Sequence, residues 1–134
     1  MVSSRKERII PFIINIILLF ILKDYILYNN SAYTIHIYSW GLMNTYLLLL
    51  LFALLKQKAS VHMAVLATSL MFYIHLLIEF QRPNIIGLIL FVFLLGIVAS
   101  SRLVLRAHTS KEIIQGFTIG LLPPILYIFT HYST

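Results

Sequence analysis

Residues 85–101 read IIGLILFVFLLGIVASS and contain no charged side chain. This run is typical of a helix that crosses a bilayer, because a spanning helix needs about 20 mainly apolar residues. A transmembrane β-barrel would instead show strands of about ten residues in which apolar and polar side chains alternate. We expect five spanning segments of the helical kind: residues 9–28, 38–55, 62–80, 85–101 and 113–129. The sequence therefore predicts an all-α, polytopic transmembrane helical bundle that forms one domain, residues 1–134.

The composition of the whole chain also favours an integral membrane protein. Of its 134 residues, 60% are hydrophobic and 10% are charged, and the mean hydropathy is +0.95. A soluble globular domain has about 25% charged residues, so the composition excludes a soluble domain, a disordered tail and a coiled coil. The chain has no cysteine, which excludes a disulfide scaffold, a thiolate metal site and a cysteine nucleophile.

The basic residues gather on one side of the predicted bundle. The net charge is +6, from ten Lys and Arg against four Asp and Glu. With five spans, eight basic residues share the side of the N-terminus: Arg5, Lys6, Arg8, Lys56, Lys58, Arg102, Arg106 and Lys111. Lys23 and Arg82 fall on the other side. The positive-inside rule favours the cytoplasm for the basic side. Phosphate-bearing lipids suit this side better as partners than nucleic acid does.

The loop before the last span carries residues suited to phosphate chemistry. Thr109 and Glu112 have the spacing of a capping box at the start of a helix. One helical turn would bring the Glu112 carboxylate back to His108, where it could hold one ring nitrogen protonated and leave the other free as a nucleophile or base. The Arg102 guanidinium suits phosphate oxygens, and the helix N-terminus adds free N–H groups.

A second segment at the start of the third span repeats this pattern. Ser60 is a candidate N-cap, His62 could protonate a leaving oxygen, and Lys58 could neutralise phosphate charge. Two histidines of different role beside fixed cations suit phosphoryl transfer through a phosphohistidine, and we expect no metal or other cofactor. The residues alone leave a plainer interpretation open, in which the cations are topology signals and the histidines are interfacial.

The spacing of these residues resembles a known enzyme family. Ser101, Arg102 and His108 are spaced as in SRxxxxxHxxxD, the third signature of the type 2 phosphatidic acid phosphatase superfamily, and Glu112 stands where Asp is usual. Upstream, residues 59–62 read ASVH and are similar to the second signature, PSGH, without its Pro and Gly.

The first signature of the family, KxxxxxxRP, has a weaker counterpart. Residues 5–11 read RKERIIP, which keeps basic residues, Arg8 among them, ahead of a proline. The resemblance is to compact bacterial members of the family, and this chain is similar to their last five helices.

The resemblance implies a phosphatase of the bacterial inner membrane that hydrolyses a lipid phosphate or pyrophosphate. His108 would be the nucleophile, Glu112 its orienting partner and His62 the acid for the leaving group. The remaining site residues would bind phosphate: Arg102, Ser60, Lys58 and Arg8. The departures from the signatures leave an alternative open, a catalytically degenerate membrane subunit that packs against a partner. A small lipid- or anion-binding bundle is a third interpretation, and a homo-oligomer remains open in each case.

Two further pairs of residues have helical spacing. His75 and Glu79 lie one turn apart near the end of the third span, and we expect either a structural pair or a Glu79 side chain that snorkels to the interface. Gly116 and Gly120 have the GxxxG spacing of closely packed helices, and we expect packing within the chain rather than a dimer face.

Overall fold

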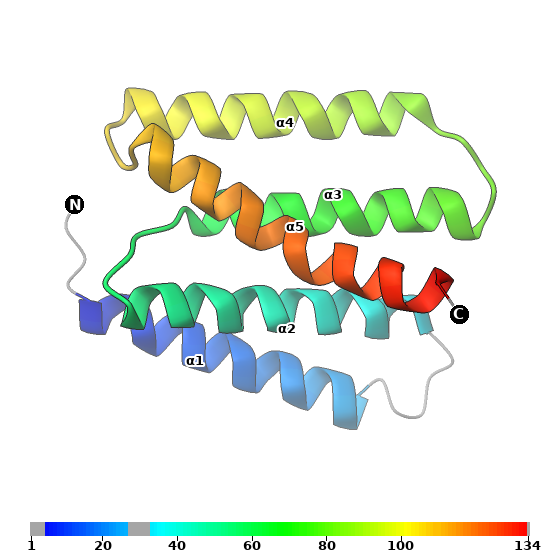
Figure 1. Cartoon of the computed structure of the whole chain (residues 1–134), viewed down its shortest axis with the longest axis horizontal. Helices are drawn as coiled ribbons and strands as arrows, with labels where there is room; N and C mark the ends of the chain where they lie inside the picture. The colour runs from blue at the N-terminus through cyan, green and yellow to red at the C-terminus, as the bar shows by residue number, and fades with distance from the viewer. Residues whose placement is uncertain (1–4, 27–32, 134) are drawn as a thin grey trace. The chain divides into compact units, whose positions relative to one another are not determined.

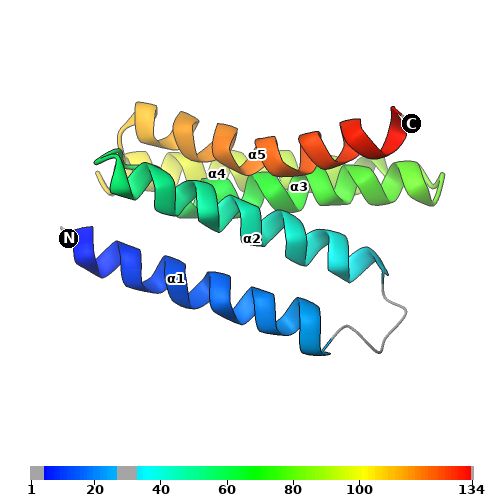
Figure 2. The ribbon, with the colours of Figure 1, turned by 60° about the horizontal axis from the view of Figure 1, so that its bottom comes forward.

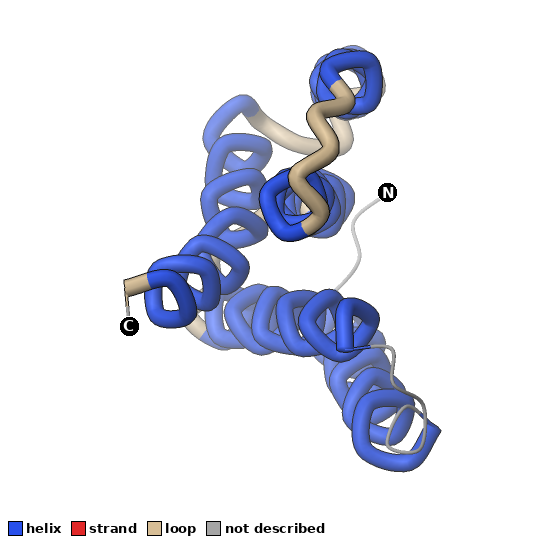
Figure 3. Tube along the Cα trace, turned by 90° about the vertical axis from the view of Figure 1, so that its right-hand side faces the viewer, coloured by secondary structure: helices blue, strands red, loops and turns tan. Residues whose placement is uncertain are grey.

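The computed structural model describes residues 5–26 and 33–133, and over these residues the chain consists of helices and the loops between them (Figures 1 and 3). The elements in chain order are α1 (Arg5–Ile21), the π-helical turn η1 (Leu22–Ile26), α2 (Tyr33–Leu54), α3 (Val61–Glu79), α4 (Ile85–Val104) and α5 (Ser110–Tyr132). The prediction of an all-α fold is confirmed for the described residues.

Four of the described helices, α2 to α5, are long and apolar enough to cross a membrane. The first predicted span forms α1, which has 17 residues and begins with charged side chains, and then η1. Within η1, Lys23 and Asp24 form an ion pair of 3.6 Å. Residues 27 and 28, the end of that predicted span, lie outside the described residues. The expectation of five spanning helices is therefore supported for four.

The chain folds as two compact units, residues 1–58 and residues 59–134. In the first unit α1 packs against α2, and the buried ring of Phe12 lies 6.2 Å from the ring of Tyr46, measured between centroids. Inside α2, the buried Thr45 hydroxyl donates to the carbonyl of Gly41 at 2.9 Å. This satisfies a polar group that would otherwise be costly in an apolar environment.

In the second unit α3 packs against both α4 and α5 (Figures 1 and 2). Buried Met63, Leu95 and Ile113 bring the three helices together in one apolar core. Much of the outward face of α4 is exposed and apolar, as at Val92 and Phe93. Such a surface is typical of a helix that faces lipid, where the surrounding solvent is as apolar as the side chains.

Helices α3 and α5 approach each other closely along small residues, which we call the α3–α5 seam: Ser60, Ala64 and Thr68 against Gly116 and Gly120. A Cβ atom added at Gly116 would overlap the backbone of Ser60, and one added at Gly120 would overlap the backbone of Ala64. The Thr68 hydroxyl links the two helices across the seam. It is within hydrogen-bonding distance of the Gly120 carbonyl oxygen on α5, at 2.9 Å, and of the Ala64 carbonyl oxygen on α3, at 3.0 Å. The expectation that the GxxxG residues pack within the chain is confirmed.

Candidate active site

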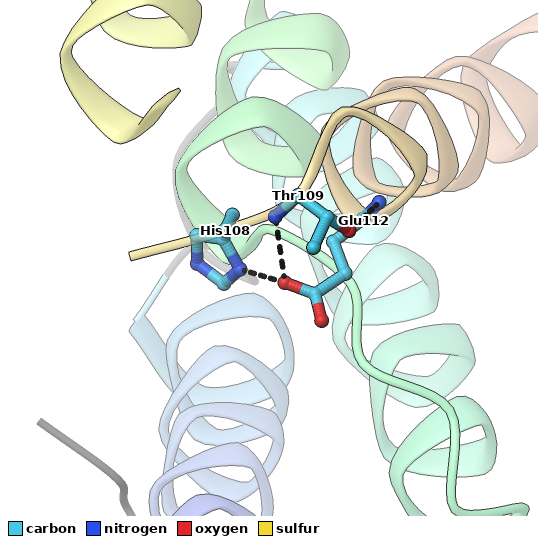
Figure 4. Close-up of polar contacts among 3 residues, drawn as sticks. All are labelled: His108, Thr109 and Glu112. Atoms are coloured by element: carbon cyan, nitrogen blue, oxygen red, sulfur yellow. Dashed lines mark hydrogen bonds and ion pairs between the residues drawn. The ribbon is translucent and has the colours of Figure 1, made fainter. Parts of the chain in front are cut away.

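The first turn of α5 holds His108 in one orientation. A capping box is present: the Glu112 amide donates to the Thr109 hydroxyl at 3.3 Å, and the Thr109 amide donates to Glu112 Oε2 at 3.2 Å. The same Oε2 atom lies 2.9 Å from His108 Nδ1 (Figure 4). An ionised carboxylate only accepts hydrogen bonds, so Nδ1 carries the hydrogen. The neutral imidazole then has its lone pair on Nε2, as a nucleophile requires.

The end of α4 places His108 beside Arg102. After α4 ends, Arg106 has a left-handed backbone conformation with φ of 50°. The chain turns back there, and the amides of Ala107 and His108 both donate to the Arg102 carbonyl, at 3.0 Å and 3.3 Å. Such bonds satisfy carbonyl groups that a helix C-terminus leaves without partners. The chain between the last turn of α4 and His108 is therefore fixed by backbone bonds.

The start of α3 is tied to the same turn of α5. The Ser60 amide donates to the Glu112 carbonyl at 3.0 Å. Ser60 occupies the N-cap position of α3, as predicted, but its hydroxyl makes no capping bond. The residue is fully buried, and its hydroxyl is one of two buried side-chain polar atoms without a hydrogen-bond partner in the described chain. The prediction of Ser60 as the N-cap residue is therefore confirmed for its position, and the side-chain capping bond is absent.

His62 lies in the first turn of α3 with an exposed side chain. Both Arg102 and His108 are close enough for their charges to act on the His62 imidazole. Arg102 and His108 lie six residues apart in the chain, and the fold brings His62, which lies 40 residues before Arg102, within reach of their charges. Because all three are cationic or can become so, they repel one another unless an anion lies among them. This arrangement suits the binding of a phosphate group.

Two of the predicted phosphate ligands belong to the other unit of the chain. Lys58 is the exposed last residue of the unit of residues 1–58, and Arg8 is a half-buried residue of α1. The unit that holds His62, Arg102 and His108 therefore contains neither of them. Among the described residues, no group of three His, Cys, Asp or Glu side chains is arranged to hold a metal ion.

The pair predicted at the other end of α3 does not form. His75 is buried, with 4% of its surface exposed, and its ring meets those of Tyr127 and Tyr132 edge-on at 6.1 Å and 6.2 Å. Glu79 instead accepts a hydrogen bond of 2.7 Å from the Tyr132 hydroxyl. Of the two alternatives expected for these residues, the His75–Glu79 pair is wrong, because Glu79 bonds to Tyr132 of α5.

A groove on α4 was not foreseen from the sequence. It has a volume of about 740 Å³ and is lined by residues of α4 between Val92 and Leu105. Its walls are apolar except for Ser100 and Ser101, which come just before Arg102 in the chain. The sequence signal was present in the small residue Gly96, at which an added Cβ would meet no atom within 4 Å.

A comparison with protein families, curated proteins and solved structures gives no match for this chain. The class of the protein therefore rests on its own features. It is an all-α protein with four candidate membrane spans in its described part. In its second unit, the charges of Arg102 and His108 act on the imidazole of His62.

Proposed function

We propose that this protein is an integral membrane phosphatase of the type 2 phosphatidic acid phosphatase kind, which removes a phosphate or pyrophosphate group from a lipid. The observation that carries the proposal is the orientation of His108. Its Nδ1 is engaged by Glu112 at 2.9 Å. Its backbone amide donates to the Arg102 carbonyl at 3.3 Å, and the charges of Arg102 and His108 act on the His62 imidazole. This matches the needs of a histidine nucleophile, an orienting carboxylate, a phosphate-binding cation and a separate acid.

The reaction would proceed in two displacements at phosphorus. In the first, the lone pair of His108 Nε2 attacks phosphorus, the bond to the lipid oxygen breaks, and His62 gives its proton to that oxygen. In the second, His62 takes a proton from water as the water attacks phosphorus, the P–N bond breaks, and inorganic phosphate leaves. Arg102 would stabilise the charge on the non-bridging oxygens.

The apolar surroundings of the site support a lipid substrate. The residues that line the groove on α4 include Ser101, which precedes Arg102 in the chain. A hydrocarbon tail could lie in this groove while the phosphate reaches the cations at the end of the helix. The excess of basic residues on one predicted side of the membrane favours a site at the cytoplasmic face of a bacterial inner membrane.

A phosphate-release assay tests the proposal. The purified protein in lipid nanodiscs is given phosphatidic acid, phosphatidylglycerol phosphate or undecaprenyl pyrophosphate, and free phosphate is measured. We expect release from at least one of these lipids, its persistence in a chelator, and its loss in His108→Ala and His62→Ala with unchanged melting temperatures. Phosphate release by His108→Ala at the parent rate would contradict the proposal, as would activity that chelator removes and Mg²⁺ restores.

One observation favours a second candidate, a catalytically degenerate subunit. The Ser60 side chain, which the resemblance assigns to phosphate binding, is fully buried under α5. In the subunit interpretation the histidines no longer turn over substrate, and the protein serves a membrane partner. Absence of phosphate release from all three lipids, together with copurification of a membrane protein, would favour this candidate.

A further inference from the structure

We propose that Gly116 positions the nucleophile His108, because the absence of a side chain at Gly116 sets how closely α5 docks on the start of α3. This inference rests on the proposed function for its effect on turnover. Its structural part, the effect of Gly116 on the His108–Glu112 pair, can be measured without any activity.

The first step is the contact between Gly116 and Ser60. The three atoms that an added Cβ would meet first are the carbonyl oxygen, amide nitrogen and carbonyl carbon of Ser60. All three belong to the backbone, so no side-chain rotation can make room. The first turns of α5 would have to move away from α3.

The second step leads from this contact to Glu112. Gly116 lies one helical turn after Glu112, and the Glu112 carbonyl accepts the Ser60 amide at 3.0 Å. The Ser60 amide precedes α3 and has no carbonyl of its own helix to donate to. A displacement of α5 would therefore break the bond that ties the Glu112 turn to α3.

The third step leads from Glu112 to the reacting atoms. Glu112 Oε2 lies 2.9 Å from His108 Nδ1 and 3.2 Å from the Thr109 amide. His62, the proposed acid, lies in the first turn of α3, directly after Ser60 and Val61. Moving the Glu112 turn would therefore move His108 relative to His62. A misplacement of about 1 Å can reduce a rate about 100-fold, because the attacking and leaving groups must stay aligned.

Gly120 offers a matched control on the same helix. An added Cβ at Gly120 would overlap the backbone of Ala64 even more closely than one at Gly116 overlaps that of Ser60, so Gly120→Ala is a strict control. Gly120 lies one turn further along the seam. Its carbonyl accepts a hydrogen bond from the Thr68 hydroxyl, which is not a residue of the candidate active site. Both Gly116→Ala and Gly120→Ala therefore disturb the α3–α5 seam. Only Gly116→Ala does so at Ser60, whose amide bonds to Glu112.

The test combines NMR of the His108 imidazole with kinetics, for protein in nanodiscs. We expect a hydrogen-bonded Nδ1–H signal for His108 in the parent and in Gly120→Ala, and loss of that signal in Gly116→Ala. Where the parent releases phosphate, kcat should fall about 100-fold in Gly116→Ala with KM nearly unchanged, and much less in Gly120→Ala. Equal loss of signal in both variants would overturn the inference, because Gly116 would then be a packing residue only.

The outcomes separate this inference from the proposed function. In one outcome the parent releases no phosphate, and the Nδ1–H signal is lost in Gly116→Ala but kept in Gly120→Ala. This outcome supports the positioning role of Gly116 and contradicts the proposed phosphatase activity. An active parent whose Gly116→Ala variant keeps both the signal and kcat overturns the positioning alone. If Gly116→Ala fails to fold, hydrogen exchange of the parent protein tests the Ser60–Glu112 bond on which the inference depends. The Ser60 amide should then exchange far more slowly than the His62 amide, and equal rates would overturn the inference.

Discussion

The Glu112 side chain serves two structural purposes at once, because one of its oxygens accepts from both the Thr109 amide and His108. Capping alone needs only a hydrogen-bond acceptor, and a Gln side chain supplies one. Holding a histidine that becomes positively charged during attack needs the negative charge as well. The two purposes can therefore be separated by an isosteric substitution.

Glu112→Gln should reduce kcat about 100-fold and leave the melting temperature within a few degrees of the parent. The amide oxygen can still accept from Thr109, while the charge that stabilises the His108 imidazolium is lost. Phosphate release and a thermal melt on the same preparation measure both quantities. An unchanged kcat would show that Glu112 acts only as a cap.

The buried side chain of His75 lowers the stability of the fold, because one of its polar atoms has no hydrogen-bond partner among the described residues. Its Nδ1 is buried and makes no hydrogen bond within the described chain. Substitution by Leu removes this unsatisfied group and keeps a similar volume. We expect His75→Leu to be as stable as the parent or more stable by about 1 kcal/mol.

The same variant should keep the parent rate of phosphate release. His75 lies on α3 about 20 Å along the helix axis from His62, at 1.5 Å per residue. Chemical denaturation and the phosphate assay check the two expectations. Loss of activity at unchanged stability would reveal a role for His75 that the proposed mechanism does not contain.

At the scale of elements, the site depends on how helices end and begin. The turn between α4 and α5 is closed by Arg106 in a left-handed conformation, with φ of 50°. An L-residue other than Gly pays about 1–2 kcal/mol for this conformation, and a β-branched residue fits it worst. The turn therefore keeps His108 close to Arg102 in the chain, and the unfavourable conformation of Arg106 reduces the free energy of unfolding.

Arg106→Gly should raise the free energy of unfolding by about 0.5–1 kcal/mol, and Arg106→Val should lower it by about 1–2 kcal/mol. Both substitutions remove the same charge, so each is the electrostatic control for the other. Thermal melts in nanodiscs provide the measurement. Equal melting temperatures for the two variants would mean that the backbone at residue 106 is not held as described.

Local features of the elements could be predicted from the sequence, and contacts between elements could not. The Thr109–Glu112 capping box and its reach to His108 follow from spacing along one helix, and the structure contains both. The bond from Ser60 to Glu112 joins segments far apart in the chain, and no spacing pattern reveals it. For the same reason the spacing along α3 favours His75 as a partner for Glu79, whereas the residue that bonds to Glu79 is Tyr132 of α5.

At the scale of the whole molecule, the account depends on which helices cross the membrane. Helices α3 and α4 are both long and apolar enough to do so. Two crossings return the chain to the side from which it started, so the beginning of α3 and the beginning of α5 share a side. The apolar composition made these spans predictable, because a bilayer demands about 20 apolar residues for each crossing.

Single cysteines test this topology cleanly, because the chain has none of its own. In intact cells, an impermeant thiol reagent should treat Gln57→Cys and Ser110→Cys alike and Gln81→Cys in the opposite way. Ser3→Cys should follow Gln57→Cys if the first predicted segment also crosses. Different labelling at Gln57 and Ser110 would contradict the shared face and the active site with it.

The central claim is that His108 carries the phosphoryl group during turnover. The most direct measurement is rapid quenching of the nanodisc protein during turnover of a ³²P-labelled lipid, followed by mass spectrometry of its peptides. The account predicts a phosphoryl group on His108 that survives alkali and is lost in acid, and that is absent from His108→Ala. Turnover without a labelled histidine, or with the label on another residue, would contradict it.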